Sequence, residues 1–145
     1  MNAAFSLAVL LLSPLHADAM RQQDWPDAEK IASLLPELRR FGGPNAHDCG
    51  MVPYGKDRTE AFSCVGRAEG RASPYWVAVQ LQGIDSQIWS VAILTTSSEH
   101  ILLQYDSDSS GGSESTPSPL FSYRKCRTFV LDAKSSRPIV CAHGL

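Results

Sequence analysis

The sequence predicts an α+β fold, with two N-terminal helices packed on one face of a roughly five-stranded antiparallel meander and held by two disulfides. Up to Gly70, apolar residues repeat at helical spacing, and from Pro74 onward they alternate with a period of two. The chain contains four cysteines, an even number. Helices followed by a run of short strands are typical of a two-layer α+β domain.

The first helix is predicted from an apolar stripe at helical spacing, which consists of Ala28, Ile31, Leu34, Leu35, Leu38 and Phe41. Asp24 or Asp27 can cap its start. Pro36 lies inside the stripe, so we expect a kink or two short helices that meet near Leu35. The segment Gly42-Gly43-Pro44 should end the helix.

A loop is expected over residues 45–56, and a second helix follows it. Asp57 and Glu60 stand three residues apart, as in a capping box with Asp57 in the capping role. Behind them an apolar stripe at helical spacing is formed by Ala61, Cys64, Val65 and Ala68. We therefore expect a helix that ends near Gly70 and has Cys64 on its buried face.

Strands are expected at residues 75–81, 87–95, 100–105, 121–130 and 138–142, with the last two forming a hairpin around residues 132–136. Residues 107–118 are rich in Ser, Gly and Pro and are predicted to be a mobile loop. The second strand, unlike the first, is apolar on both faces.

One face of the predicted sheet should be covered by the helices, through Tyr75, Val77, Val79 and Leu81. The other face would then show Trp76, Ala78, Ile88, Ala92, Leu94 and Leu102. This second face is more apolar than a solvated one, so the mobile loop covers it, a partner covers it, or the assumed register is wrong. The candidate binding residues are Trp76, Ile88, Leu94, Leu102 and, from the preceding loop, His47.

Residues 1–19 are predicted to be a signal peptide. Residues 3–15 form an apolar run shorter than the about 20 residues that span a bilayer. The small-x-small pattern Ala17-Asp18-Ala19 follows, as at a signal peptidase site. Because the run is preceded by no Lys or Arg, a short uncleaved anchor or a buried helix is the alternative. We expect residues 20–145 to form a single domain, periplasmic or secreted, with no membrane attachment after signal removal.

The cysteines are Cys49, Cys64, Cys126 and Cys141. An even count in an exported chain predicts two disulfides, for which three pairings exist. The spacing favours Cys49–Cys64 and Cys126–Cys141, and in a regular hairpin Cys126 lies opposite Cys141. No Cys-x-x-Cys pair occurs and no His stands at ligand spacing from two cysteines, so the cysteines are expected to have neither a zinc-binding nor a redox role.

Charge is unevenly distributed along the chain. Residues 72–123 contain five acidic residues and no Lys or Arg, whereas residues 124–145 contain five basic residues and one acidic residue. The basic segment either folds beside the acidic one or forms a basic hairpin for an acidic partner. The basic cluster is small, so nucleic acid is not expected as a partner.

Few residues are typical of catalysis. No serine stands in a Gly-x-Ser-x-Gly motif, and His100 is expected to be an exposed strand residue. His47-Asp48 is the one local cluster with catalytic residue types, and a small envelope hydrolase could combine it with Asp85 or Asp106. A structural loop in which Asp48 accepts backbone N–H groups is the favoured interpretation.

Residues 106–111 copy the opening of a calcium loop, with oxygen ligands at Asp106, Asp108 and Ser110 and a possible further one at Glu114. The twelfth position, where a bidentate Glu belongs, is Pro117. We therefore expect a flexible acidic loop and no metal, and keep a calcium-stabilised structural module as an alternative.

The segment His47-Asp48-Cys49-Gly50 resembles part of the Cys-x-x-His-Asp-Cys loop of periplasmic inhibitors of vertebrate-type lysozymes. The resemblance implies that His47 would be inserted into the lysozyme cleft. Pro44 stands where that family has its first loop cysteine, so the loop cannot close in the family's way. The likeness gives no family assignment.

The sequence thus leads us to expect an exported, non-enzymatic binding domain of a bacterial-type envelope, such as an inhibitor or an immunity-type protein. A protein partner and no cofactor are expected, and the oligomeric state is open. The hydrolase and the calcium-stabilised module are the alternatives.

Overall fold

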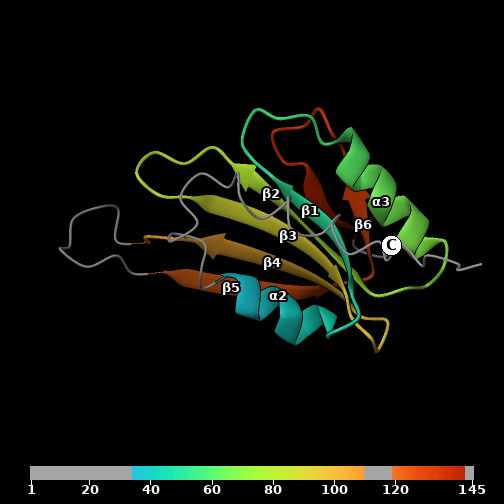
Figure 1. Ribbon diagram of the computed structural model, residues 1–145. Helices are drawn as coiled ribbons and strands as arrows, with labels where there is room; N and C mark the ends of the chain where they lie inside the picture. Colours follow the sequence, from blue (N-terminus) through green and yellow to red (C-terminus); the bar gives the residue numbers. More distant parts are fainter. Residues whose placement is uncertain (1–33, 110–118, 143–145) are drawn as a thin grey trace, which may run out of the picture.

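The computed structural model describes residues 34–109 and 119–142 of the 145-residue chain. Within these ranges the protein is α+β, as predicted: two helices accompany a five-stranded sheet and a separate two-stranded sheet (Figure 1). The predicted signal peptide, Asp24, Asp27 and residues 110–118 of the predicted loop lie outside the described residues.

The main sheet is mixed, with the order β1 (His47–Val52), β2 (Tyr75–Leu81), β3 (Ile88–Leu94), β4 (His100–Asp106) and β5 (Leu120–Cys126). β1 runs parallel to β2, whereas the remaining neighbours are antiparallel. The predicted purely antiparallel meander is therefore wrong, and so is the loop predicted over residues 45–56. A helix connects β1 to β2, which is how a chain returns to add a parallel strand.

The two helices cover opposite faces of this sheet. α2 (Leu34–Gly42) packs Leu34 and Leu38 against a cluster that includes Trp76, Val91 and Leu103. α3 (Thr59–Glu69) packs on the other face through a cluster that includes Val65, Val77 and Leu102. The prediction that both helices precede the sheet is wrong, because β1 lies between them in the chain. The prediction that they share one face is also wrong, because they belong to two different core clusters.

Strand pairing decides which side chains share a face. Val77 pairs with Ala92, which pairs with Leu102, and all three belong to the cluster under α3. Trp76 pairs with Ile93 and belongs to the cluster under α2. The predicted apolar face, which combined Trp76 with Ala92 and Leu102, rested on the wrong register. Opposite residues in a pair point to the same face, so a slip of one residue exchanges the faces.

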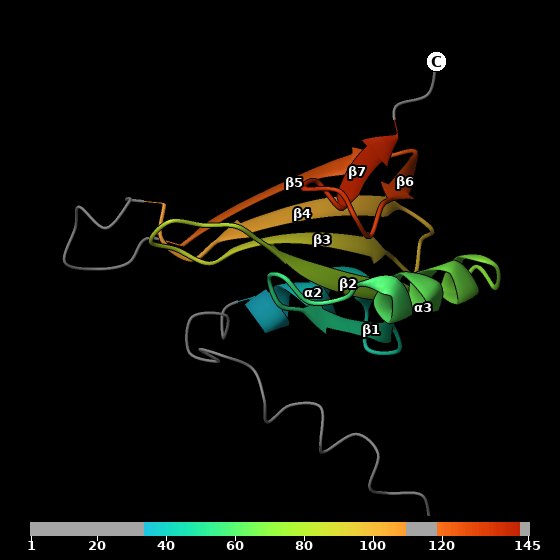
Figure 2. The ribbon, with the colours of Figure 1, turned by 90° about the horizontal axis from the view of Figure 1, so that it is seen from above.

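A small hairpin of β6 (Thr128–Leu131) and β7 (Ile139–Ala142) lies beside the main sheet (Figure 2). The strand predicted over residues 121–130 is thus divided at Arg127. As a result Phe129, not Cys126, pairs with Cys141. Ile139 and Cys141 of β7 belong to the same core cluster as α3, so the hairpin covers the α3 face of the sheet.

Both disulfides have the favoured pairing. Cys49 of β1 is bonded to Cys64 of α3, with their Cα atoms 5.5 Å apart. Cys126 of β5 is bonded to Cys141 of β7, with a Cα separation of 5.2 Å. Each bond therefore ties a covering element to an edge strand of the main sheet.

Both described helices end near the predicted residues, but the predicted capping box of Asp57 is not formed: the residue that caps α3 is Arg58, which makes no side-chain capping hydrogen bond. Pro36 lies in the first turn of α2, where its missing N–H leaves no hydrogen bond unmade. Gly43, with φ of 85°, ends α2 and donates its N–H to the carbonyl of Arg39. Before α3, the carboxylate of Asp57 accepts the N–H and hydroxyl of Thr59, and these hydrogen bonds lower the pKa of Asp57. Neither described helix is long and apolar enough to cross a membrane.

Candidate functional site

A cleft of about 570 Å³ separates α3 from the β6 strand of the hairpin. Its walls and floor come from three elements and one turn that are far apart in the sequence. The lining residues are Thr59, Phe62, Ser63, Val65, Gly66 and Glu69 of α3, Tyr75 of β2, Thr128, Phe129 and Leu131 of β6, and Ala133. Most of these side chains are apolar or small and polar, which is usual for a site that binds a ligand.

Both walls of the cleft are held in place covalently. The Cys49–Cys64 bond ties α3 to β1, and the Cys126–Cys141 bond ties the hairpin to β5. At one end of the cleft, Arg58 Nη1 also donates to the carbonyl of Ser135, at 2.8 Å. The start of α3 is thereby joined to the β6–β7 turn.

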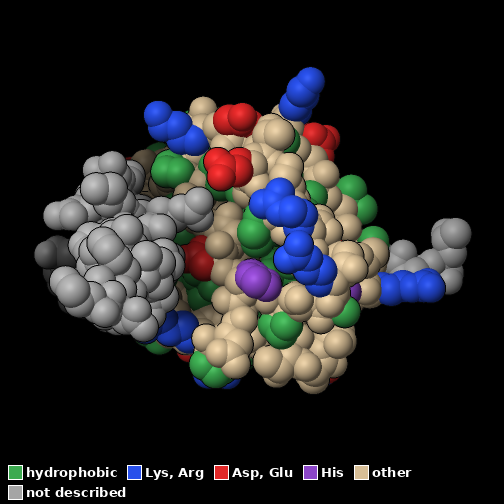
Figure 3. Space-filling view, turned by 45° about the vertical axis from the view of Figure 1, so that its right-hand side comes forward, with side chains coloured by type: hydrophobic (Ala, Val, Ile, Leu, Met, Phe, Trp, Pro, Cys, Tyr) green, Lys and Arg blue, Asp and Glu red, His purple; other side chains and the backbone are tan. Residues whose placement is uncertain are grey.

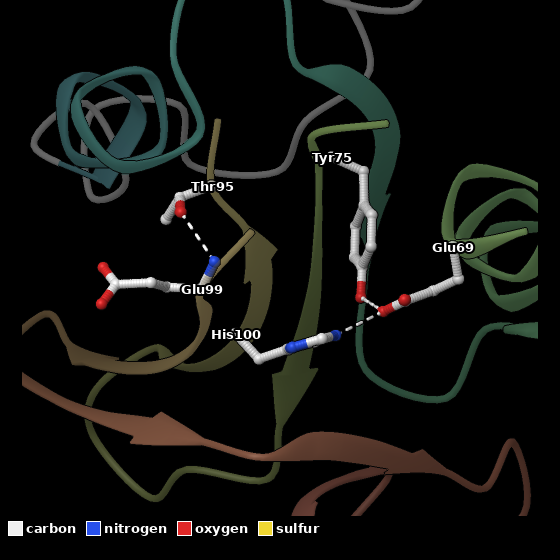
Figure 4. Close-up of polar contacts among 5 residues, drawn as sticks. All are labelled: Glu69, Tyr75, Thr95, Glu99 and His100. Carbon is white, nitrogen blue, oxygen red and sulfur yellow. Dashed lines mark hydrogen bonds and ion pairs between the residues drawn. The ribbon is translucent and has the colours of Figure 1, made fainter. Parts of the chain in front are cut away.

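Three polar side chains meet at the other end of the cleft (Figure 4). The Tyr75 hydroxyl donates to Glu69 Oε1 at 2.7 Å, and His100 Nε2 lies 2.9 Å from the same oxygen. Burial raises the pKa of Tyr75 far above its ordinary value, and the hydrogen bond to Glu69 and its negative charge act in the same direction. Tyr75 therefore keeps its proton at physiological pH and donates a hydrogen bond to Glu69.

His100 also contacts the opposite wall of the cleft. Its ring meets the ring of Phe129 edge-on, with centroids 5.2 Å apart and planes at 75°. The side chain of His100 is 16% exposed, so the expectation of an exposed strand residue is wrong. Sequence reasoning did not bring Glu69, Tyr75 and His100 together, since Tyr75 reads as a core residue and the three lie on three different elements.

The candidate binding residues taken from the sequence lie mostly in the core. Trp76, Leu94 and Leu102 are 8%, 4% and 3% exposed, on two different faces of the sheet. They have almost no surface to offer a partner, because α2 covers Trp76 while α3 and the hairpin cover the other two. Ile88 is half-buried and His47 is exposed, so their binding role stays a prediction.

The residues of the hydrolase alternative are separated by the sheet. His47 pairs with Tyr75 at one end of the strands, whereas Asp106 pairs with Ile88 at the other end, close to the turn that carries Asp85. These two ends of the sheet are six strand residues apart, from Tyr75 to Leu81 of β2, which corresponds to about 20 Å. His47 and Asp106 are therefore too far apart to act on one substrate bond. Asp48 accepts the N–H of Gly50 at 2.8 Å, as the structural interpretation expects.

The calcium-loop residues lie partly outside the described part of the chain. Asp106 Oδ1 accepts the N–H of Asp108 at 3.0 Å, while Ser110 and Glu114 are not described. No group of three or more His, Cys, Asp or Glu side chains that could hold a metal ion occurs among residues 34–109 and 119–142. The calcium module therefore stays an alternative prediction.

A second, smaller cleft of about 390 Å³ lies on the β1 side of α3. It is lined by residues 48–53 and by several charged side chains, which are Lys56, Asp57, Glu60 and Arg67. The segment His47-Asp48-Cys49-Gly50 belongs to β1, and its cysteine forms the disulfide with Cys64 of α3.

On the part of the face in Figure 3 that the described residues form, apolar side chains stand among polar and charged ones. Among the described residues, Lys125 of the basic C-terminal segment forms an ion pair with Glu99 of the acidic middle of the chain. Comparison of the chain with family models, curated proteins and solved structures gave no match.

Proposed function

We propose that this protein is an exported, non-enzymatic binding domain of a bacterial-type envelope, such as an inhibitor or an immunity-type protein, and that the cleft between α3 and β6 holds a segment of its protein partner. The observation that carries the proposal is that each wall of this cleft is joined to the main sheet by its own disulfide.

Two cross-linked walls favour binding because they are already ordered in the free protein, that is, the cleft is pre-organised. A surface that must be ordered during binding loses affinity, since the entropy of ordering opposes association. Here α3 and the hairpin are cross-linked before any partner arrives. The volume of the cleft also lies within the usual range for ligand sites, roughly 300 to 1,000 Å³.

The disulfides also support export. Such bonds form and persist in oxidising compartments and are rare in the cytosol. All four cysteines are bonded, which is consistent with a periplasmic or secreted location after removal of the predicted signal peptide.

The test uses a random heptapeptide library displayed on phage, with the oxidised protein as bait. Gly66 lines the cleft and has no atom within 4 Å of the position of an added Cβ, so Gly66→Trp introduces a large side chain at the cleft from a position where its Cβ meets open space. Ile84→Trp places the same side chain at a 99% exposed position at the other end of the sheet.

We expect the wild-type protein and Ile84→Trp to select the same peptides, and Gly66→Trp to bind these peptides at least tenfold more weakly. Circular dichroism and thermal unfolding of the three proteins verify that all are folded. Failure to enrich any peptide, or equal binding by Gly66→Trp, would contradict the proposal.

A further inference from the structure

The cleft has one wall that is a β-strand with an open edge. We infer that the ligand binds there as an extended segment of a partner protein, which pairs with the free edge of β6 and places a cationic group on Glu69. This inference rests on the proposed function, and it adds the conformation and the charge of the bound segment.

One edge of β6 is not paired with another described strand. β6 pairs with β7 on one side, and no other strand pairs with it within residues 34–109 and 119–142. Over the same ranges, residues 128–131 make no backbone hydrogen bond outside the β6–β7 pair. Such an edge presents unpaired N–H and C=O groups that an incoming strand can satisfy. The cleft is lined by residues of β6 and α3 and by no residue of β7, so a segment bound in it would lie next to β6 and not next to β7.

The two walls match in length. β6 has four residues and α3 has eleven. At about 3.3 Å per strand residue and 1.5 Å per helical residue, they extend over about 13 and 16 Å. A strand of four or five residues would fill this length, and its alternate side chains would point toward the cleft floor or away from it. Phe62 and Phe129, on opposite walls, offer an apolar contact to one of these side chains.

Glu69 supplies the charge. It is the one acidic or basic residue among the described residues that line the cleft, and its side chain is 35% exposed. Its Oε1 atom already accepts from Tyr75 and lies against His100, whereas Oε2 accepts no hydrogen bond from any described residue. A carboxylate held in this way favours an ammonium or guanidinium group on the ligand.

The two edges of the main sheet, β1 and β5, are less suited to this mode. β1 has an irregularity between Asp48 and Met51, with Gly50 at φ of 97°, and such bulges disturb an edge. Its neighbouring cleft is also smaller and more charged. The edge strand β5 carries Arg124 and Lys125 on its exposed surface, which is typical of edges protected against pairing.

The first experiment measures strand pairing. The heptapeptides enriched by the wild-type protein are synthesised with single N-methyl groups at each backbone amide, which removes one donor at a time. We expect N-methylation to weaken binding about tenfold at alternate positions and little at the positions between them, because successive amides of a strand point to opposite edges. Equal losses at all positions, or losses with helical spacing, would overturn the inference.

The second experiment measures the charge. Glu69→Gln keeps an oxygen acceptor for Tyr75 and His100 but removes the negative charge, and Asp85→Asn removes one exposed charge at the other end of the sheet. We expect the enriched peptides to contain Lys or Arg and to bind Glu69→Gln at least tenfold more weakly at low salt, with Asp85→Asn unchanged. Replacing the basic residue of the peptide with Gln should abolish the difference between wild type and Glu69→Gln.

The two proposals fail in different ways. One outcome is that Gly66→Trp blocks the binding of peptides that lack a basic residue, or whose binding shows no alternation on N-methylation. That result would support the proposed function and overturn the strand inference. If no peptide is enriched and sedimentation shows a dimer that Gly66→Trp dissociates, a second copy of the chain occupies the cleft. That result would overturn both proposals.

Discussion

The hydroxyl of Tyr75 donates a hydrogen bond of 2.7 Å to Oε1 of Glu69, joining the first residue of β2 to the last residue of α3. His100 of β4 lies 2.9 Å from the same oxygen, so the two bonds connect the sheet to the helix from two strands. This contact holds Glu69 at the end of the cleft, in the position that the proposed binding mode uses.

Replacing Tyr75 with Phe should lower the free energy of unfolding by about 1 kcal/mol at neutral pH, since one buried hydrogen bond is lost. The dependence of the free energy of unfolding on pH above neutrality should change as well. The pKa of Tyr75 is raised above its ordinary value of 10.0, so its contribution is present below pH 10 and is lost as the pH rises further. Urea unfolding between pH 8 and about 11 should show a falling stability for the wild type and a flatter curve for Tyr75→Phe. Tyr54→Phe, at a residue 54% exposed, is the control and should keep the wild-type slope.

Removing the Cys126–Cys141 bond by a double replacement with Ser should cost about 3 kcal/mol of stability, given its sequence separation of 15. The loss should be concentrated in the hairpin, because this bond is what ties β7 to β5. Hydrogen exchange should accelerate in β6 and β7 more than in β2 and β3. The matched double replacement of Cys49 and Cys64 should accelerate exchange in α3 instead. Uniform acceleration in both variants would show that the bonds do not hold the cleft walls separately.

Replacing Gly66 with Ala should stabilise the protein by up to about 1 kcal/mol, since Ala is the better helix former and the added Cβ meets no atom within 4 Å. Gly43→Ala should have the opposite effect, because Gly43 has φ of 85° and ends α2. Chemical denaturation of both variants measures the difference. A loss of stability in Gly66→Ala would mean that the cleft does not have the open space described.

Truncating Leu102 to Ala should destabilise the protein by about 2 to 5 kcal/mol, as expected for a leucine in a close-packed core. The same change at Val130, which is 55% exposed, should cost less than about 0.5 kcal/mol. Thermal and urea unfolding of the two variants test whether Leu102, which the sequence pattern places on an exposed face, is a core residue. Near-equal stabilities of the two variants would contradict the assignment of Leu102 to the core.

Much of the secondary structure could be predicted because its signals are local. The period-two pattern at residues 75–81 coincides with β2, and the stripe through Ala61, Val65 and Ala68 coincides with α3. β1 was missed, since its six residues include Gly50 and an irregular register and show no alternation. The division at Arg127 was missed because nothing in the local pattern separates β5 from β6.

Local residue patterns determined where α3 and most strands lie, and the spacing of the cysteines favoured the pairing that is present. The tertiary structure alone decided that the helices cover opposite faces and that Glu69, Tyr75 and His100 meet at one cleft. The physical reason is that periodicity along a chain reports which side chains of one element share a face. It does not report the register between elements, and that register is set by packing among residues that are distant in the sequence.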